Sequence, residues 1–215
     1  MKCDKKAMLL YAVTDRVWVG ERSLYEQVEA ALKNGVTCIQ LREKNLDEDA
    51  FLAEAMALSK LCKQYHVPFI VNDNVDIAIQ CGADGVHVGQ EDMSISDVRA
   101  RVGDGMIIGV SAHTVDEALE AVKNGADYLG LGAVFSTSTK TDVNQMSNAT
   151  LKAICSAVHV PTVAIGGISG KNILQLSGSG VDGVAVVSAI FAAEDSGAAT
   201  AELLALAREM LQVHS

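Results

Sequence analysis

The stretch GADGVHV (82–88) contains the pattern that decides the fold: a glycine that ends a helix, a short polar joint and a continuous apolar run. GADYLGLG (125–132) and GVDGVAVV (180–187) repeat this pattern further along the chain. A continuous apolar run, in contrast to an alternating one, is typical of a parallel strand that is buried on both faces. We therefore interpret the glycine-to-aspartate joints as structural connections from a helix into a strand.

Five more apolar runs bring the set to eight, and amphipathic helical patterns lie between them. Several of these helical patterns end in glycine, as a C-terminal cap would. The predicted strands are residues 8–13, 37–41, 68–71, 85–88, 106–110, 127–132, 161–165 and 182–187. The clearest predicted helices are residues 24–35, 47–66, 114–126 and 151–159, with a last helix near 198–213.

Eight strands that alternate with helices predict an α/β fold, a single (β/α)8 TIM barrel with a parallel eight-stranded core that spans residues 1–215 as one domain. The alternative is an open doubly wound sheet, which usually has fewer strands and a glycine-rich loop after the first. Here the first predicted strand is followed by TDRVW (14–18), which is not glycine-rich. This favours the barrel.

Composition and charge limit the classes of partner. The chain has 215 residues, 49% of them apolar, and its 17 Lys and Arg against 27 Asp and Glu give a formal net charge of −10. A net negative surface repels phosphate backbones and anionic lipids, so we expect neither nucleic-acid nor membrane binding. One local pocket can still be positive, which leaves small phosphorylated molecules as partners. The sequence leaves homo-oligomerisation open.

Cysteine usage predicts a cytoplasmic location. Five cysteines are an odd number and no two have CxxC spacing, which argues against a disulfide framework or a structural zinc site. The first apolar run is followed at once by Thr14 and Asp15 and lacks a cleavage site, so we interpret it as a strand and not as a signal segment. No stretch approaches the roughly 20 apolar residues of a membrane helix.

Polar residues follow almost every predicted strand, at the end where (β/α)8 barrels carry their chemistry. Gln40, Arg42 and Lys44 are spaced by two, which would place all three on one face of a strand. Facing the barrel mouth, they would present one amide and two cations to a phosphorylated ligand. The alternative is a solvated strand end at the surface.

Asp73 and Asp92 follow neighbouring predicted strands, so their carboxylates could approach each other. Beside cationic phosphate ligands such a pair suggests Mg²⁺, which takes one or two carboxylates together with substrate phosphates and water. The alternative is that each aspartate caps the helix after it. We interpret His87 as a hydrogen-bonding histidine of the interior, because neither it nor His113 has a third ligand at zinc spacing.

Two further segments predict phosphate contacts. The loop STSTKT (136–141) combines hydroxyls with one cation. We interpret it as a phosphate-binding loop or as part of a lid that residues 136–142 form. Gly166-Gly167 and Val187-Ser188 follow the last two strands, where barrels of this type direct backbone N–H groups and a short helix N-terminus at an anion. The alternatives are a solvated loop and two turn glycines.

Together these segments resemble the thiamine phosphate synthase family. The resemblance spans nearly the whole chain, and its specific part is the combination of QLREK, GQED and TSTK. It is carried by QLREK (40–44), VND (71–73), HVGQED (87–92), GVSAHT (109–114), GLGAVFSTSTK (130–140), AIGGI (164–168) and VAVVSAIF (184–191).

The resemblance implies a transferase that joins hydroxymethylpyrimidine diphosphate to a thiazole phosphate and releases pyrophosphate. It implies an Mg²⁺ ion bound by Asp73 and Asp92. The catalytic residues that it implies are Arg42, Lys44, Ser111 and Lys140. The substrate-binding residues that it implies are Gln40, Arg42, Lys44, Asn72, Ser111, Thr137, Ser138, Thr139, Lys140, Gly167, Val187 and Ser188.

Other functions remain open at this point. A thiazole tautomerase of the same superfamily shares the barrel, an REK segment and the phosphate glycines, but it lacks the acid of GQED. A non-catalytic phosphate-binding barrel would act as a regulator and would need no magnesium pair. A Schiff-base aldolase would need a lysine such as Lys44 or Lys140 inside the barrel, but both have an anion-binding interpretation.

Overall fold

The strands form a closed ring in which all neighbours are parallel. The computed structural model describes residues 3–20, 22–136 and 145–212. Each strand pairs with the next one along the chain, and the last pairs with the first, which confirms the barrel and excludes the open sheet. The strands are β1 (Leu10–Val13), β2 (Cys38–Leu41), β3 (Phe69–Asn72), β4 (Gly85–Val88), β5 (Ile107–Ala112), β6 (Tyr128–Gly132), β7 (Thr162–Ile165) and β8 (Gly183–Val186).

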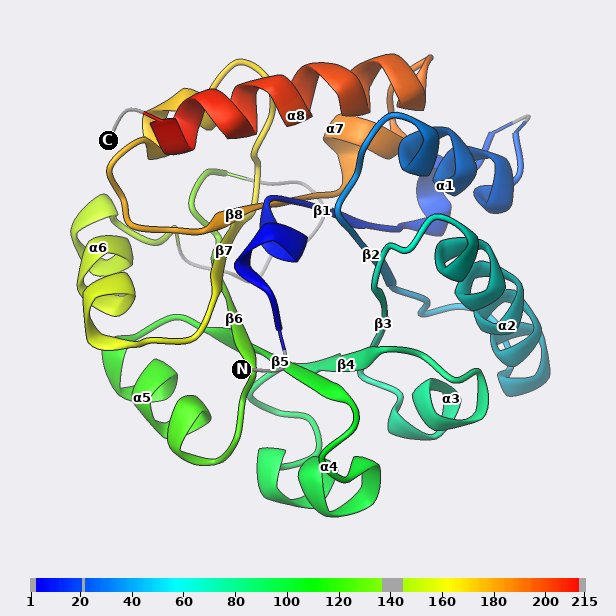
Figure 1. Cartoon of the computed structure of the whole chain (residues 1–215), viewed down its shortest axis with the longest axis horizontal. Coiled ribbons are helices and arrows are strands. Elements are labelled where there is room, and N and C mark those ends of the chain that lie inside the picture. The colour runs from blue at the N-terminus through cyan, green and yellow to red at the C-terminus, as the bar shows by residue number, and fades with distance from the viewer. Residues whose placement is uncertain (1–2, 21, 137–144, 213–215) are drawn as a thin grey trace.

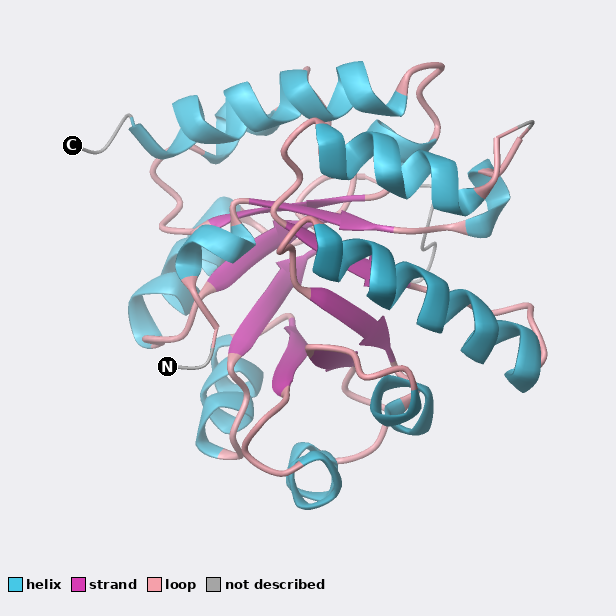
Figure 2. Cartoon of the chain, turned by 45° about the vertical axis from the view of Figure 1, so that its right-hand side comes forward, coloured by secondary structure: helices cyan, strands magenta, loops and turns pink. Residues whose placement is uncertain are grey.

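Helices surround this ring on the outside (Figure 1), and the strands form the inner layer (Figure 2). Helices α3 and α4, with 6 and 8 residues, are too short for a clear periodicity, and the sequence did not single them out. Among the helices of the described ranges, none is long and apolar enough to cross a bilayer. The α-helices are α1 (Leu24–Lys33), α2 (Glu48–Gln64), α3 (Val75–Gln80), α4 (Ile95–Val102), α5 (Val115–Lys123), α6 (Asn148–Ala157), α7 (Ser188–Phe191) and α8 (Ser196–Gln212), and the 3-10 helices are η1 (Lys5–Met8), η2 (Arg16–Trp18) and η3 (Ile173–Leu176).

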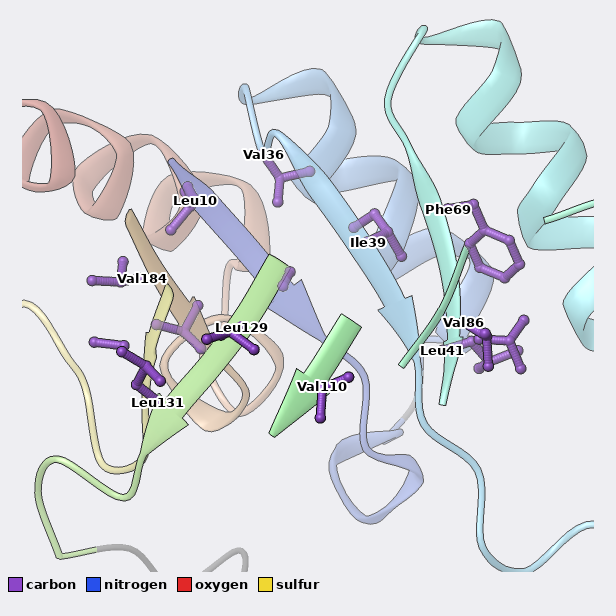
Figure 3. Close-up of a cluster of buried hydrophobic side chains, with 14 of the residues drawn as sticks. Leu10, Val36, Ile39, Leu41, Phe69, Val86, Val110, Leu129, Leu131 and Val184 are labelled. Atoms are coloured by element: carbon purple, nitrogen blue, oxygen red, sulfur yellow. The ribbon is translucent and has the colours of Figure 1, made fainter. Parts of the chain in front are cut away.

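The side chains of the strands divide between two cores, because successive residues of a strand face opposite sides. On β1, Leu10 and Ala12 pack toward the helices, whereas Tyr11 and Val13 pack inside the barrel. Polar atoms in this inner core therefore belong to the barrel interior and its mouth. Figure 3 shows part of the outer core, with Leu10, Val36, Ile39, Leu41, Phe69, Val86, Val110, Leu129, Leu131 and Val184 labelled.

The repeated glycine-to-aspartate joints are structural, as predicted. Asp84 donates its backbone N–H to the carbonyl oxygen of Phe69 and accepts the N–H of Phe69 on its carboxylate, both at 2.9 Å. Asp127 and Asp182 bind the starts of β5 and β7 in the same two-bond manner. Each aspartate thereby pairs the strand that it precedes with a neighbouring strand of the ring.

The N-terminal segment closes one end of the barrel. Helix η1 packs against β1, β7 and β8, and Figure 1 shows the blue start of the chain across this opening. The approach is close enough to require glycine at position 183, where a Cβ would lie 1.9 Å from the carbonyl oxygen of Met8. The C-terminal ends of the strands form the opposite end.

Candidate active site

The C-terminal ends of the strands surround a pocket of about 160 Å³ at the barrel mouth. Its wall is partly apolar, with contributions from Val13, Ile165 and Ile168. Such a wall with a few convergent polar groups is typical of a small-molecule site. The predicted site residues that line this pocket are Gln40, Arg42, Asn72, Ser111, Gly167, Val187 and Ser188.

The prediction that Gln40, Arg42 and Lys44 lie on one face of a strand is wrong for Lys44. Strand β2 ends at Leu41, so the period of two does not extend to residue 44. Gln40 and Arg42 line the pocket, and Arg42 lies 3.5 Å from the Asp15 carboxylate. Lys44 turns toward the next strand, where its Nζ lies 2.5 Å from Oδ2 of Asp73.

Glu43 holds the loop that carries both cations, a role that the sequence analysis missed. One carboxylate oxygen accepts the backbone N–H groups of Lys44, Asn45 and Leu46 at 2.8, 2.7 and 3.3 Å. The other oxygen accepts from Nε of Arg16 at 2.6 Å. Burial alone would raise the pKa of Glu43, but these donors outweigh it and hold the pKa below its usual value.

The loop after β3 holds Asp73 beside a second carboxylate. Asp73 has a φ of +61°, a left-handed conformation that costs most residues energy and that clusters at functional sites. Burial raises the pKa of the Asp73 carboxyl, Lys44 lowers it, and the neighbouring Asp92 carboxylate raises it again, for a net increase. Asp92 is itself oriented by the backbone N–H of Gly89, at 2.7 Å from Oδ2.

The helix-capping alternative for the two aspartates is excluded. Asn74 caps α3 and Ser94 caps α4, each with its own side chain. Two adjacent carboxylates with one lysine offer hard oxygen donors and an excess of negative charge, which fit Mg²⁺. Within the described residues no cluster of three or more His, Cys, Asp or Glu side chains forms a complete metal cage, so such an ion would also need phosphate or water ligands.

The phosphate end of the pocket is made of backbone. Gly166 and Gly167 have φ values of +102° and +63°, and α7 begins at Ser188 beside them in the pocket wall. A Cβ at position 167 would lie 2.2 Å from the carbonyl oxygen of Ser136, so only glycine fits there. The remaining predicted contacts lie outside the described residues: Thr137, Ser138, Thr139 and Lys140.

A chain of polar side chains crosses the interior beneath the pocket. Nε2 of Gln40 donates to the hydroxyl of Tyr11 at 2.8 Å, and this hydroxyl lies 2.7 Å from that of Tyr128. His87 lies between Tyr128 and Ser111, with Nδ1 at 2.9 Å and Nε2 at 3.0 Å from their oxygens. His87 is thus a hydrogen-bonded interior histidine, as predicted, whereas no motif marked the two tyrosines.

The chain is similar to known proteins along most of its length. A family model described as thiamine monophosphate synthase matches residues 10–190. Thiamine-phosphate synthases of Clostridium acetobutylicum and Clostridioides difficile are 48% and 49% identical to the chain, over 86% and 89% of its length and 88% and 91% of theirs. A solved thiamine phosphate pyrophosphorylase of Pyrococcus furiosus is 40% identical, with a TM-score of 0.89 over 96% of this chain and 98% of that one. The chain therefore belongs to the thiamine monophosphate synthase family.

Proposed function

We propose that this transferase forms thiamine phosphate by an Mg²⁺-assisted dissociative displacement. The pyrimidine methylene loses pyrophosphate, and the nitrogen lone pair of the thiazole phosphate then bonds to that carbon. The observation that supports this best is the arrangement at the mouth. Arg42 and Asn72 line one partly apolar pocket, and Asp73, which accepts from Asn72, contacts both Lys44 and Asp92.

In this proposal the pyrimidine diphosphate binds between β2, β3 and β5. Arg42 and Lys44 hold the diphosphate, Arg42 with a planar fork of donors and Lys44 as a mobile charge. Gln40, Asn72 and Ser111 bind the remaining polar atoms of the substrate, since all three line the pocket. Lys44 exchanges its present partner, Asp73, for the phosphate oxygens.

The thiazole phosphate binds on the other side, at β7 and β8. Gly167, Val187 and Ser188 surround its phosphate with backbone N–H groups and the start of α7. Thr137, Ser138 and Thr139 complete this contact from the adjoining loop. In this proposal the two substrates lie on opposite walls of one pocket, and the thiazole nitrogen approaches the pyrimidine carbon from within the pocket.

Asp73 and Asp92 are the residues that would hold Mg²⁺, which when bound supplies positive charge to the leaving diphosphate. The chain's own cations do the same work, because negative charge grows on the pyrophosphate as its bond breaks. The carbon left behind is a cation that water would trap. The apolar wall of the pocket excludes water during this step. The predicted lid of residues 136–142 lies largely outside the described residues.

The reaction needs no general base, because the thiazole nitrogen already carries a free lone pair. We place the reaction in the cytoplasm, where thiols stay reduced. All five cysteines are free, and burial raises the pKa of Cys3 and of Cys62 to about 12, so both thiols stay protonated and unreactive.

Pyrophosphate release tests the proposal directly. With purified protein and hydroxymethylpyrimidine diphosphate, we expect release and thiamine phosphate formation only when thiazole phosphate and Mg²⁺ are both present. Omission of each component in turn is the control. A folded protein that binds phosphate ligands without releasing pyrophosphate would instead indicate the tautomerase or the regulatory barrel.

Replacement of Lys140 by alanine is expected to reduce turnover about a hundredfold or more, as loss of one preorganised charge at a leaving group typically does. Steady-state rates of pyrophosphate release measure this, with Lys171→Ala, an exposed cation of the β7 loop, as the matched control. Unchanged turnover in the Lys140 variant would remove this residue from the mechanism.

A further inference from the structure

We propose that the hydrogen-bond chain Gln40–Tyr11–Tyr128–His87–Ser111 has one direction, and that Tyr11 and Tyr128 act as positioning residues that commit the Ser111 hydroxyl to donate into the pocket. This hydrogen-bond chain joins five strands, β2, β1, β6, β4 and β5. Its two end residues, Gln40 and Ser111, both line the pocket. The two tyrosines act through His87 and Ser111 and not on the substrate. This inference rests on the proposed function only for its kinetic consequence.

The direction begins at Gln40. An amide nitrogen can only donate, so the Tyr11 oxygen accepts from Nε2 of Gln40. Tyr11 has one hydrogen to donate, and two atoms lie within its reach: the Tyr128 oxygen, at 2.7 Å, and the thiol of Cys38. Because a thiol sulfur is a weak acceptor, the hydrogen goes to Tyr128. Burial, first of all, raises the pKa of both tyrosines well above the usual value, so each hydroxyl keeps its hydrogen throughout the working pH range.

The same donor and acceptor argument applies to Tyr128 and His87. Tyr128 accepts from Tyr11, so its own hydrogen goes to Nδ1 of His87, at 2.9 Å. A neutral imidazole that accepts at one nitrogen donates at the other, so Nε2 of His87 donates to Ser111 Oγ, at 3.0 Å. Ser111 therefore accepts from the protein, and its remaining hydrogen is available for an acceptor atom of a ligand, such as a ring nitrogen.

The surroundings fix these side chains in place. Tyr11 and Tyr128 are 1% and 0% exposed, so water cannot substitute for a lost partner. Gly109 makes room for the Tyr128 ring, because a Cβ there would lie 2.1 Å from its Cζ. Buried hydroxyls are normally hydrogen-bonded, and each of these two has a partner on either side, Gln40 and Tyr128 for Tyr11 and Tyr11 and His87 for Tyr128.

The tautomer of His87 tests the direction without any substrate. In ¹⁵N-histidine-labelled, ligand-free protein, we expect the His87 proton on Nε2 and an unprotonated Nδ1, with the signals assigned by difference against His87→Gln. In Tyr128→Phe the donor to Nδ1 is lost, and we expect a mixture of the two tautomers. A wild-type His87 protonated at Nδ1 would mean that the chain runs the other way and would overturn the proposal.

Kinetics test the positioning role separately. In Tyr128→Phe we expect the KM for pyrimidine diphosphate to rise about fivefold to tenfold, as for loss of one oriented hydrogen bond, with the KM for thiazole phosphate unchanged. Tyr11→Phe should have a smaller effect, because Tyr128 can still donate to His87. The exposed Tyr25→Phe is the control.

The two readouts separate the possible failures. Equal effects of Tyr11→Phe and Tyr128→Phe on both KM values would indicate a packing role only and would overturn the positioning claim. If the wild-type protein releases no pyrophosphate but the His87 tautomer is the expected one, the direction of the hydrogen-bond chain is confirmed and the proposed function is wrong.

Discussion

Replacement of Asp92 by asparagine is expected to reduce Mg²⁺-dependent turnover by about a hundredfold or more, the largest effect that we expect from a single isosteric change. The asparagine oxygen can still accept the N–H of Gly89, which orients Asp92 at 2.7 Å, so the loop geometry is kept. What is lost is one of two charged oxygen ligands, and even residues that only support metal ligands are worth about 10- to 100-fold in metal affinity.

The measurement is the rate of pyrophosphate release as a function of Mg²⁺ concentration, together with calorimetric titration of Mg²⁺ in the presence of pyrophosphate. Asp49→Asn, at an exposed position in the first turn of α2, is the control for charge loss. A variant that keeps the Mg²⁺ dependence of the wild type would show that Asp92 is not a ligand, whatever its position beside Asp73.

Replacement of Glu43 by glutamine is expected to destabilise the protein by about 2 kcal/mol at neutral pH, as for lost hydrogen bonds to a buried charge, and to lower turnover at least about tenfold. Three backbone N–H groups and Arg16 converge on this carboxylate. A glutamine NH₂ would face either the backbone donors or the guanidinium, so the loop with Arg42 and Lys44 loses its anchor.

The stability difference between wild type and Glu43→Gln should depend on pH. Because the folded pKa of Glu43 is depressed, its contribution is fully present above the unfolded pKa, near 4.5, and is lost as the pH falls through the folded value. Urea unfolding at neutral pH and at successively lower pH measures this. Glu54→Gln, which removes the more exposed partner of Arg16, should cost less, and a pH-independent difference would contradict the role of the Glu43 charge.

Much of the fold follows from local patterns in the sequence. The predicted strand 37–41 is observed as Cys38–Leu41, and the predicted helix 47–66 as Glu48–Gln64. Ser23 caps the start of α1 and Asp47 caps the start of α2, as local sequence rules predict. In contrast, the prediction that Lys44 shares a strand face with Gln40 was wrong, because β2 ends at Leu41 and the alternation of side chains ends with it.

The lining of the pocket was predictable where its residues lie at or just after the end of a strand. Asp73 and Asp92 were paired correctly because neighbouring strands bring their following loops together. Glu43 was missed because a single buried carboxylate between two cations carries no signal of its own in the sequence. Its function depends on Arg16, which lies 27 positions away.

The sequence by itself determined the barrel, the end at which its chemistry lies and the family, because continuous apolar runs must be buried on both faces and a helix must separate parallel neighbours. The tertiary structure alone decided which polar atoms are partners. Tyr11 and Tyr128 are 117 positions apart and meet through a 2.7 Å bond. The physical reason is that burial follows from the type of each residue, whereas a hydrogen bond requires two particular atoms to meet, and only the closed ring brings them together.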